Sequence, residues 1–356
     1  MQTVAEETKT GNLMMTKEIT DRSSSGNEDK KAGVEAVLDY FPDMSGYQFF
    51  IFIYCYYGYM GVATSVAGNI FYQYSTNFEC DQYSNSSSPL IQDLAYLNIT
   101  DSCKYHKPVG CSEDFPDMSD EYIRQCFQNT TIETCQSFSY NDPLFNETIV
   151  KEYDLVCDQA RMPAYIIMLF NIGMAIGPVI SAKIGEKLGR AKQMSIGGVL
   201  ILIINLLIAF NTIGGAWGYA VLRLLGVIIA MILALPAMVY PTEVLTQKYR
   251  SICGLLVVST ALGAGILLVV LFAVFCREWR QLQLIISFVT LPSIVAPWIM
   301  PESYRWLYSQ DRIEEAEESL RILSKRCGGR VDEDILKKIR NGIESSSSEQ
   351  KGTLGL

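Results

Sequence analysis

The sequence is nearly free of histidine and lacks the short motifs that mark most enzymes and pumps. Its one histidine is His106, and neither His-Glu-x-x-His nor Gly-x-Ser-x-Gly occurs in the chain. An intramembrane hydrolase is therefore disfavoured, and we expect no catalytic residue, metal site or cofactor. Gly-Lys-Ser/Thr, which ends a phosphate-binding loop, is also missing. That absence disfavours a pump driven by ATP.

The chain also lacks the start of a secretory protein. Its first 46 residues are polar and charged, without the short apolar stretch and small-residue cleavage site of a signal peptide. We therefore expect residues 1–46 to form a cytoplasmic tail and the first apolar segment to direct membrane insertion.

Charge is scarce in six long stretches, and none of them contains Asp or Glu. Each is about long enough to cross a bilayer core of ~30 Å at ~1.5 Å per residue. One such run could be the buried helix of a soluble protein, but six with short polar connections predict an all-α membrane protein. The stretches are residues 47–72, 162–182, 194–210, 216–240, 253–275 and 281–300.

The loop between the first two stretches, residues 73–161, has the marks of the extracellular side. It holds six cysteines, which suggest up to three disulfides in one of fifteen connectivities: Cys80, Cys103, Cys111, Cys126, Cys135 and Cys157. It also holds all four Asn-x-Ser/Thr acceptors for glycans, at Asn85, Asn98, Asn129 and Asn146. We expect at least two of these asparagines to be glycosylated.

Basic residues indicate which loops face the cytoplasm. Lys183, Lys187, Arg190 and Lys192 crowd the loop after the second stretch, as expected for a cytoplasmic loop. Both termini are then cytoplasmic in a multi-pass plasma-membrane protein, with residues 301–356 forming cytoplasmic helices, expected at 309–329 and 332–343, and a Ser-rich tail. The extracellular loop carries 15 acidic and 5 basic residues, a balance that favours cationic solutes outside. No nucleic-acid partner is expected.

A few polar side chains inside the apolar stretches are candidates for contacts with a substrate. Tyr54 and Tyr57 lie in an unusually aromatic first stretch and can face an organic cation, whereas Arg223 favours an anion. Asn171 is the fourth candidate. Small residues recur every fourth position at Gly173, Gly177, Ser181, Gly185 and Gly189, which permits close helix packing, either static or sliding.

Five motifs together point to one family. "GEKLGRAK" (185–192) is a degraded match to the cytoplasmic signature of the major facilitator superfamily, in which Gly189 and Arg190 match and Glu186 and Lys187 are substitutions. The other four motifs are "EYDLVCD" (152–158), "TEVLTQKYRSICG" (242–254), "EWRQLQ" (278–283) and "PESYRWL" (301–307). All five stand in the order and spacing of the family around the spans. The chain therefore resembles the organic cation/carnitine/anion transporter branch, although Tyr304 stands where the family usually has Pro.

This resemblance implies a transporter of small organic ions that works by alternating access. It also implies a cytoplasmic charge network that holds helix ends together in the outward-facing state, formed by Glu186, Arg190, Glu243, Arg250, Glu302 and Arg305. Static capping of the helices is the alternative.

Six spans are one half of the superfamily fold. The chain is thus expected to be a truncated or partial transporter that lacks its C-terminal half, or a half-transporter that pairs with a second copy. A glycosylated membrane protein that binds extracellular partners without transport is the alternative from another functional class.

Overall fold

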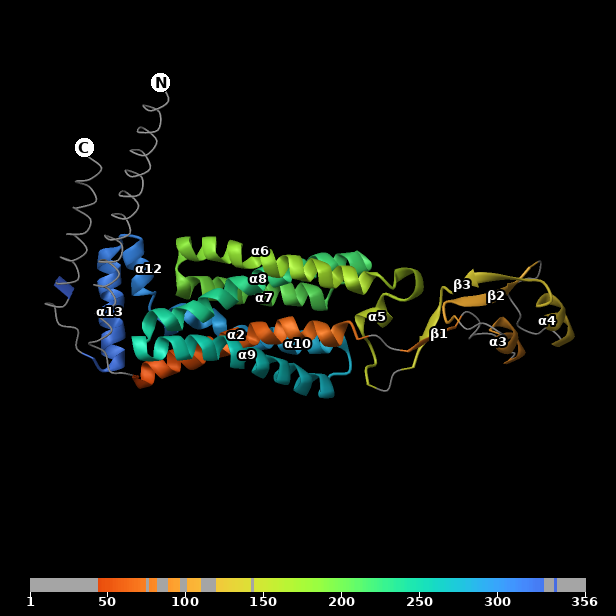
Figure 1. Ribbon diagram of the computed structural model, residues 1–356, viewed down its shortest axis with the longest axis horizontal. Coiled ribbons are helices and arrows are strands. Elements are labelled where there is room, and N and C mark those ends of the chain that lie inside the picture. Colours follow the sequence, from red (N-terminus) through yellow and green to blue (C-terminus); the bar gives the residue numbers. More distant parts are fainter. Residues whose placement is uncertain are drawn as a thin grey trace, which may run out of the picture.

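The structure is a computed structural model that describes residues 44–74, 77–81, 89–96, 101–109, 120–141, 144–329 and 336–337. Six helical spans form a bundle, as the sequence predicts. The described residues between α2 and α6, which we call the loop module, extend from one end of the bundle (Figure 1). Two short helices cover the other end. The first five spans are α2 (Gly46–Tyr72), α6 (Met162–Leu188), α7 (Arg190–Ala209), α8 (Gly215–Val244) and α9 (Gln247–Phe275).

The sixth span is broken, which the sequence analysis did not anticipate. It consists of α10 (Trp279–Val289), the 3-10 turn η3 (Leu291–Val295) and α11 (Ala296–Ile299). Pro292 and Pro297 lie in the first turns of η3 and α11, where their missing N–H groups cost no helical hydrogen bond. The two prolines explain why one apolar stretch forms three short helical segments.

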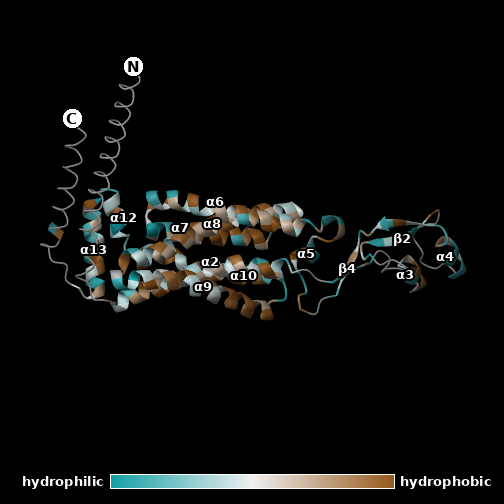
Figure 2. Cartoon of the chain, in the orientation of Figure 1, coloured by the Kyte–Doolittle hydropathy of each residue, from teal (hydrophilic) through white to brown (hydrophobic). Residues whose placement is uncertain are grey.

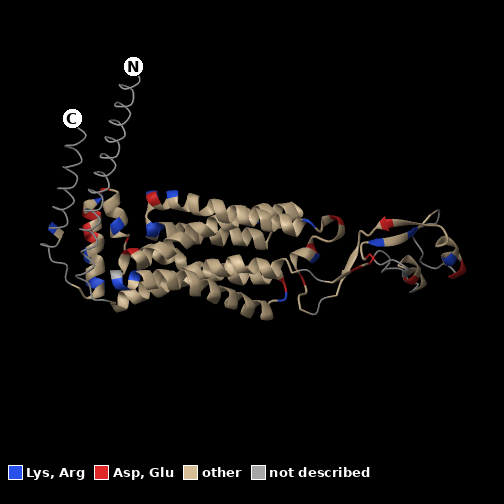
Figure 3. Ribbon diagram, viewed as in Figure 1, with Lys and Arg blue, Asp and Glu red and all other residues tan. Residues whose placement is uncertain are grey.

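Hydropathy and charge divide the bundle along its length. Apolar residues fill the spans (Figure 2), and in the described part of the chain most charged residues lie at the two ends of the bundle and beyond (Figure 3). Arg223 inside α8 is an exception. Such a distribution is expected of helices that cross a hydrocarbon layer, where an unpaired charge is costly.

Helix α8 is central, since it packs against α6, α7, α2 and α9. The small-residue stripe of α6 faces it: a Cβ added at Gly173 would collide with Val227, and Ser181 Oγ donates to the Met231 carbonyl at 2.8 Å. The stripe therefore brings the α6 and α8 backbones close together. Helices α6 and α9 bury only narrow stripes and leave most of their apolar surface uncovered in this chain.

The chain is mostly helical, as predicted, and its disulfide-bonded loop module adds four short strands in the described residues. Strand β1 (Phe78–Cys80) pairs antiparallel with β4 (Phe138–Tyr140), and β2 (Lys104–Pro108) with β3 (Thr130–Thr134). Its helical elements are α3 (Pro89–Ala95), α4 (Asp120–Cys126), α5 (Ile149–Glu152) and the 3-10 turn η2 (Cys157–Gln159). Strands this short carry no periodicity that distinguishes them from loop.

Disulfides hold the loop module together. They join Cys80 to Cys135 and Cys103 to Cys157, and Cys126 is also disulfide-bonded; Cys111 lies outside the described residues. The first bridge connects β1 to the end of β3. The second connects the start of β2 to η2, immediately before α6. The module is therefore covalently attached close to the membrane-spanning bundle.

At the other end lie α12 (Tyr304–Ser309) and α13 (Ile313–Cys327), the latter within the predicted amphipathic stretch 309–329. The buried face of α13 includes Leu320, Leu323 and Cys327. Arg326 Nη1 donates to Tyr47 Oη at 2.6 Å, which fixes α13 against the start of α2. The other predicted helix, 332–343, lies largely outside the described residues.

The cysteines permit a direct chemical test. Cys55, Cys253, Cys276 and Cys327 are free and buried, and burial raises the pKa of the Cys327 thiol. Because thiolates are the reactive form, native protein is expected to react slowly with a maleimide even at Cys327. After unfolding without reductant, labelling followed by peptide mass spectrometry should mark these four cysteines.

The six loop cysteines should become labelled only after reduction. Labelling of two or more of them in unfolded, unreduced protein would contradict the disulfide-bonded loop.

Candidate functional site

The charged residues predicted from the motifs meet at the α13 end of the bundle. Helix α6 ends at Leu188 and α7 begins at Arg190, so one residue, Gly189, makes the whole turn with φ +86°. This left-handed conformation is favourable for glycine and strained for other residues. It aims the free N–H groups at the start of α7 towards the chain that leaves the sixth span.

Glu302 occupies that position. Its carboxylate accepts hydrogen bonds from the main-chain N–H groups of Arg190 at 2.5 Å, Ala191 at 3.0 Å and Lys192 at 3.4 Å. The first N–H groups of a helix have no partner within the helix and carry partial positive charge, so a carboxylate satisfies both needs. Glu302 thus joins the end of the sixth span to the start of α7 through the backbone.

An ion pair lies beside this cap. Arg190 Nε and Nη2 each lie 3.2 Å from Glu243 Oε1, which connects the start of α7 to the end of α8. The two side chains are 23% and 11% exposed, so solvent screens the pair only partly. An ion pair at such a position contributes about 1 kcal/mol or somewhat more.

Arg305 completes the cluster through a main-chain contact. Its Nε donates to the Glu243 carbonyl at 3.1 Å, and Trp306 Nε1 donates to the Glu186 carbonyl at 3.1 Å. The Glu186 side chain is exposed, and Arg250 is half-buried near Tyr304. The structure thus brings Arg190, Glu243, Glu302 and Arg305 together, and we call these four residues the charge cluster.

The charge cluster connects three helix ends and α12 by contacts that a small displacement would break. Ser319 Oγ on α13 donates to the Glu302 carbonyl at 2.5 Å, so α13 is included in the same assembly. Interactions worth about one to a few kcal/mol each can bias two conformations of similar energy without locking either. Contacts of this strength between helix ends can form and break reversibly.

A double-mutant cycle on Arg190 and Glu243 tests the ion pair. Arg190→Gln and Glu243→Gln should each destabilise the purified chain, and their coupling energy should be about 1–2 kcal/mol, because the pair is partly buried. The measurement is unfolding in detergent followed by circular dichroism. The same cycle on Arg312 and Glu315, whose side chains are 41% and 54% exposed, should give less than about 0.5 kcal/mol. Equal couplings would refute a special role for Arg190 and Glu243.

The four predicted substrate contacts do not form one small-molecule site. Arg223 contacts Tyr72 at one end of α2, whereas Tyr54 lies 18 residues away along that helix, or about 27 Å at 1.5 Å per residue. Tyr54 Oη donates to the Pro292 carbonyl at 2.5 Å, and Tyr57 is half-buried. The amide of Asn171 is exposed on α6 and donates to the Ile167 carbonyl at 3.0 Å.

Arg223 of α8 has aromatic neighbours. Its Nε donates to Tyr219 Oη at 2.9 Å, and its guanidinium lies 4.7 Å from the Tyr72 ring centroid. Trp279 contacts both tyrosines edge-on, and Arg223 itself is 4% exposed. Cation–π contacts of this kind compensate part of the cost of burying the charge.

Sequence reasoning missed a second polar centre, at the loop-module end. Arg280 forms an ion pair with Glu152 of α5, and its Nη2 donates to the Asn211 carbonyl at 3.0 Å; Nη1 also donates to the Ala209 carbonyl. Trp279 Nε1 donates to Glu152 Oε2 at 2.7 Å. These contacts attach the loop module to the ends of α7 and α10. Both partners stand in quoted motifs, "EYDLVCD" and "EWRQLQ", but nothing in the sequence pairs them.

Comparison with known proteins agrees with the motifs. The sugar (and other) transporter family matches residues 110–355. The chain is 30% identical over 212 residues to solute carrier family 22 member 7 of Bos taurus, covering 59% of this chain and 38% of that protein.

Two further relatives carry descriptive names. Organic cation/carnitine transporter 2 of Rattus norvegicus is 32% identical over 213 residues, with 55% and 35% covered. The organic cation transporter protein of Drosophila melanogaster is 26% identical over 282 residues, with 77% and 49% covered. The chain therefore covers less than half the length of these three curated relatives.

Proposed function

Because the chain belongs to the sugar (and other) transporter family, in the organic cation/carnitine/anion branch of the major facilitator superfamily, we propose that it carries small organic ions across the plasma membrane by alternating access. The observation that carries this proposal is the family match over residues 110–355 of a six-span chain. The charge cluster supports it, because a partly exposed ion pair and charged hydrogen bonds between helix ends suit a gate that opens and closes.

In this proposal the α13 end is cytoplasmic and the loop module is extracellular, with both termini in the cytoplasm. The disulfides of the loop module support this orientation, since they persist in oxidising compartments. The charge cluster then closes the cytoplasmic side when the carrier faces outward. Opening inward separates Arg190 from Glu243 and withdraws Glu302 from the start of α7.

The substrate path requires a second six-helix half. The apolar faces that α6 and α9 leave uncovered support this, because helices with so little buried surface fit against further helices. We propose that the C-terminal half of a longer product of the same gene covers these apolar faces. A second copy of this chain is the alternative. Sequencing the 3′ end of the transcript separates the two, since only the first predicts six further spans.

Substrate contacts are proposed along the path at different depths. Tyr54 and Arg223 contact other spans of the bundle, at Pro292 and Tyr72. Tyr57 and Asn171 are the candidates, because Tyr57 is half-buried and Asn171 is exposed with a hydrogen bond only within α6. Gly58 approaches Ala237 and Gly173 approaches Val227, ten residues apart on α8. Tyr57 and Asn171 lie one and two residues beyond these glycines in opposite directions, so they are about 20 Å apart in depth. A small ion would meet Asn171 and Tyr57 in sequence.

Glycosylation tests the orientation separately from transport. Asn129 and Asn146 are exposed in the loop module, whereas Asn85 and Asn98 lie outside the described residues. Glycosidase treatment of protein from a eukaryotic host should increase its gel mobility, and replacing both Asn129 and Asn146 with Gln should remove part of that shift. Unchanged mobility of the wild-type chain would contradict an extracellular loop module.

Transport is tested in the assembled carrier. Cells that express it should take up a labelled organic ion saturably, and Arg190→Glu should lower uptake at least tenfold with normal surface delivery, because it places two acids together in the closed state. Arg312→Glu, an exposed charge reversal beyond the charge cluster, is the matched control and should change uptake less than twofold. If none of a panel of cations, zwitterions and anions is taken up saturably, the result would favour an interaction protein that does not transport.

A further inference from the structure

Three aromatic side chains from three helices pack together inside the bundle at its loop-module end. Trp279 at the start of α10 contacts Tyr72 of α2 and Tyr219 of α8 edge-on, with ring centroids 6.2 and 5.7 Å apart. All three side chains are buried. We call Tyr72, Tyr219 and Trp279 the aromatic lid.

Polar side chains from the same three helices meet just below the aromatic lid. Asn69, Arg223 and Gln283 stand three or four residues from its members, towards the middle of the bundle. Side chains lean towards the N-terminus of their helix, so those of Arg223 and Gln283 lean back towards the lid. Tyr72 leans the other way along α2, because a Cβ added at Gly68 would lie 2.7 Å from Tyr72 Oη. We call Asn69, Arg223, Gln283 and the Tyr72 hydroxyl the polar layer.

The polar layer contains buried atoms that lack hydrogen-bond partners among the described residues. These atoms are Arg223 Nη2, Tyr72 Oη and both amide atoms of Asn69 and of Gln283. The Arg223 and Gln283 side chains belong to residues that are 4% and 0% exposed. Buried polar groups in proteins are nearly always paired, so several unpaired donors at one level point to a bound ligand.

The charge of Arg223 also lacks a counter-charge. Within the described ranges, no ion pair includes Arg223, and the six apolar stretches contain no Asp or Glu. Glu152, which accepts from Trp279 Nε1, is paired with Arg280. Since the aromatic contacts of Arg223 offset only part of the cost of burying a guanidinium, we expect a single negative charge beside it.

A small monovalent anion fits this environment. The polar layer offers N–H and O–H donors from three helices, which suits a spherical anion that has no preferred direction. A divalent anion would leave a net negative charge in a region of low dielectric, which is costly. An organic carboxylate, or an acid on a second six-helix half, would need an open approach to Arg223, which this chain almost completely covers.

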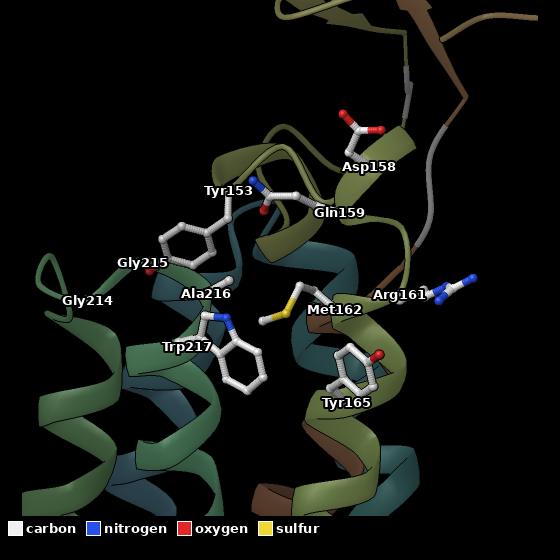
Figure 4. A pocket seen from close by; sticks show the side chains of 10 residues that line it. All are labelled: Tyr153, Asp158, Gln159, Arg161, Met162, Tyr165, Gly214, Gly215, Ala216 and Trp217. Atoms are coloured by element: carbon white, nitrogen blue, oxygen red, sulfur yellow. The ribbon is translucent and has the colours of Figure 1, made fainter. Parts of the chain in front are cut away.

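A pocket of about 590 Å³ provides an approach to the aromatic lid from solvent (Figure 4). It reaches the first turn of α8 at Trp217, two residues before Tyr219 of the lid. Figure 4 shows the charged side chains of its lining, Asp158 and Arg161, turned away from the Trp217 ring. The lining next to α8 is therefore uncharged, and a small anion can reach the lid there and pass it when the rings move.

We propose that the polar layer binds one chloride ion, held by Arg223 Nη2, Tyr72 Oη and the amide groups of Asn69 and Gln283 beneath the aromatic lid. The chloride is a resident counter-ion that stabilises the bundle and is not a transported substrate, so the site does not depend on transport. A cluster of water molecules is the competing occupant. Water would pair the polar atoms without balancing the charge, and it predicts no response to halide.

Thermal unfolding of the purified full chain in detergent tests the proposal, in sodium chloride and in sodium gluconate at equal ionic strength. A ligand that binds only the folded state stabilises it. Chloride at about ten times its Kd should therefore raise the unfolding midpoint by about 3–6 °C relative to gluconate. The rise should saturate, and bromide should also produce it. Equilibrium dialysis with radiolabelled chloride should give about one bound ion per chain.

Two variants and a control locate the ion. Arg223→Met should unfold at the same midpoint in both salts, and in gluconate it should be at least as stable as wild type, since an uncompensated buried charge is gone. Gln283→Leu keeps the charge and loses one donor, so it should raise the half-saturating chloride concentration about fivefold. Arg190→Gln, which removes a guanidinium that is paired with Glu243, should keep the full chloride response.

Three results would overturn the proposal. Equal midpoints of the wild-type chain in chloride and gluconate would leave water as the occupant. A full chloride response in Arg223→Met would place the ion elsewhere, and if that variant fails to fold, an unchanged half-saturating concentration in Gln283→Leu would do the same. Displacement of bound chloride by 2-naphthoate, a larger organic anion, would show an open substrate site instead of an enclosed one.

Discussion

Glu302→Ala is expected to lower the free energy of unfolding of the chain by about 2–4 kcal/mol. The substitution removes a charged acceptor from three main-chain N–H groups at the start of α7. Hydrogen bonds to charged groups contribute about 1.5–3 kcal/mol each, and water that reaches this partly exposed site recovers some of that loss. Titration of the purified chain with a denaturing detergent, followed by circular dichroism, measures the change.

Two variants identify the cause. Glu302→Gln keeps an acceptor oxygen without the charge and should lose about half as much. Gly189→Ala places a Cβ within 2.5 Å of Glu302 Cδ and strains a backbone with φ +86°, so it should disturb the same cap. Because both substitutions act on one contact, the double variant with Glu302→Ala should cost clearly less than the sum. Full additivity would show that Glu302 does not cap α7.

Arg280→Gln is expected to destabilise the chain by about 2–4 kcal/mol and to loosen the loop module. The guanidinium pairs with Glu152 and donates to two carbonyls at the end of α7 and after it. The substitution breaks a partly buried ion pair and removes two hydrogen bonds from a charged donor to main-chain carbonyls, which together cost more than losing an exposed ion pair. Unfolding reports the stability. The rate at which a reductant cleaves Cys103–Cys157 reports the loosening, since that bridge lies at the same junction.

A conservative substitution separates charge from geometry at this site. Arg280→Lys keeps the charge but cannot reach Glu152 and both carbonyls at once, so most of the loss should remain. Arg312→Gln removes an exposed guanidinium that also forms an ion pair, and it should change neither stability nor the reduction rate by much. Protection of Cys103–Cys157 that is unchanged in Arg280→Gln would contradict the role of Arg280 at the junction.

The sequence predicted the fold well because its main signal is local. Charge-free stretches of the right length identify six spans, and clustered cysteines identify the disulfide-bonded loop. The positions of Arg190, Glu243, Glu302 and Arg305 at helix ends also followed from spacing. Their partners did not. Glu302 binds backbone N–H groups, and Arg305 binds a carbonyl, and neither kind of partner leaves a mark in the pattern of side chains.

Other contacts were not predicted because their partners lie far apart in the sequence. Glu152 and Arg280 lie 128 residues apart, and only the folded loop module brings them together. The Arg223–Tyr219 contact spans four residues on one helix and was within reach of the sequence, whereas Tyr72 on another helix was not. The depths of Tyr54 and Arg223 could have been compared from the sequence. Each lies seven residues after the start of its apolar stretch, 47–72 or 216–240, and these two stretches start on opposite sides of the membrane in the predicted topology, so one site shared by both side chains could have been rejected.

The junction between the loop module and the bundle also sets an order of events during synthesis. Asn146 N–H donates to the Arg277 carbonyl at 2.9 Å, and the backbones of Glu147 and Glu278 form an isolated parallel β-bridge. Residue 278 leaves the ribosome 131 residues after residue 147 (278 minus 147), which takes about 7–26 s at 5–20 residues per second. During that interval the nascent module is restrained by its own cysteines and by the spans already inserted. The loop module is therefore attached to residues 277 and 278 only after its own synthesis is complete. With the loop module on the extracellular side, as proposed, an isomerase that corrects mispaired cysteines has those seconds in which to act.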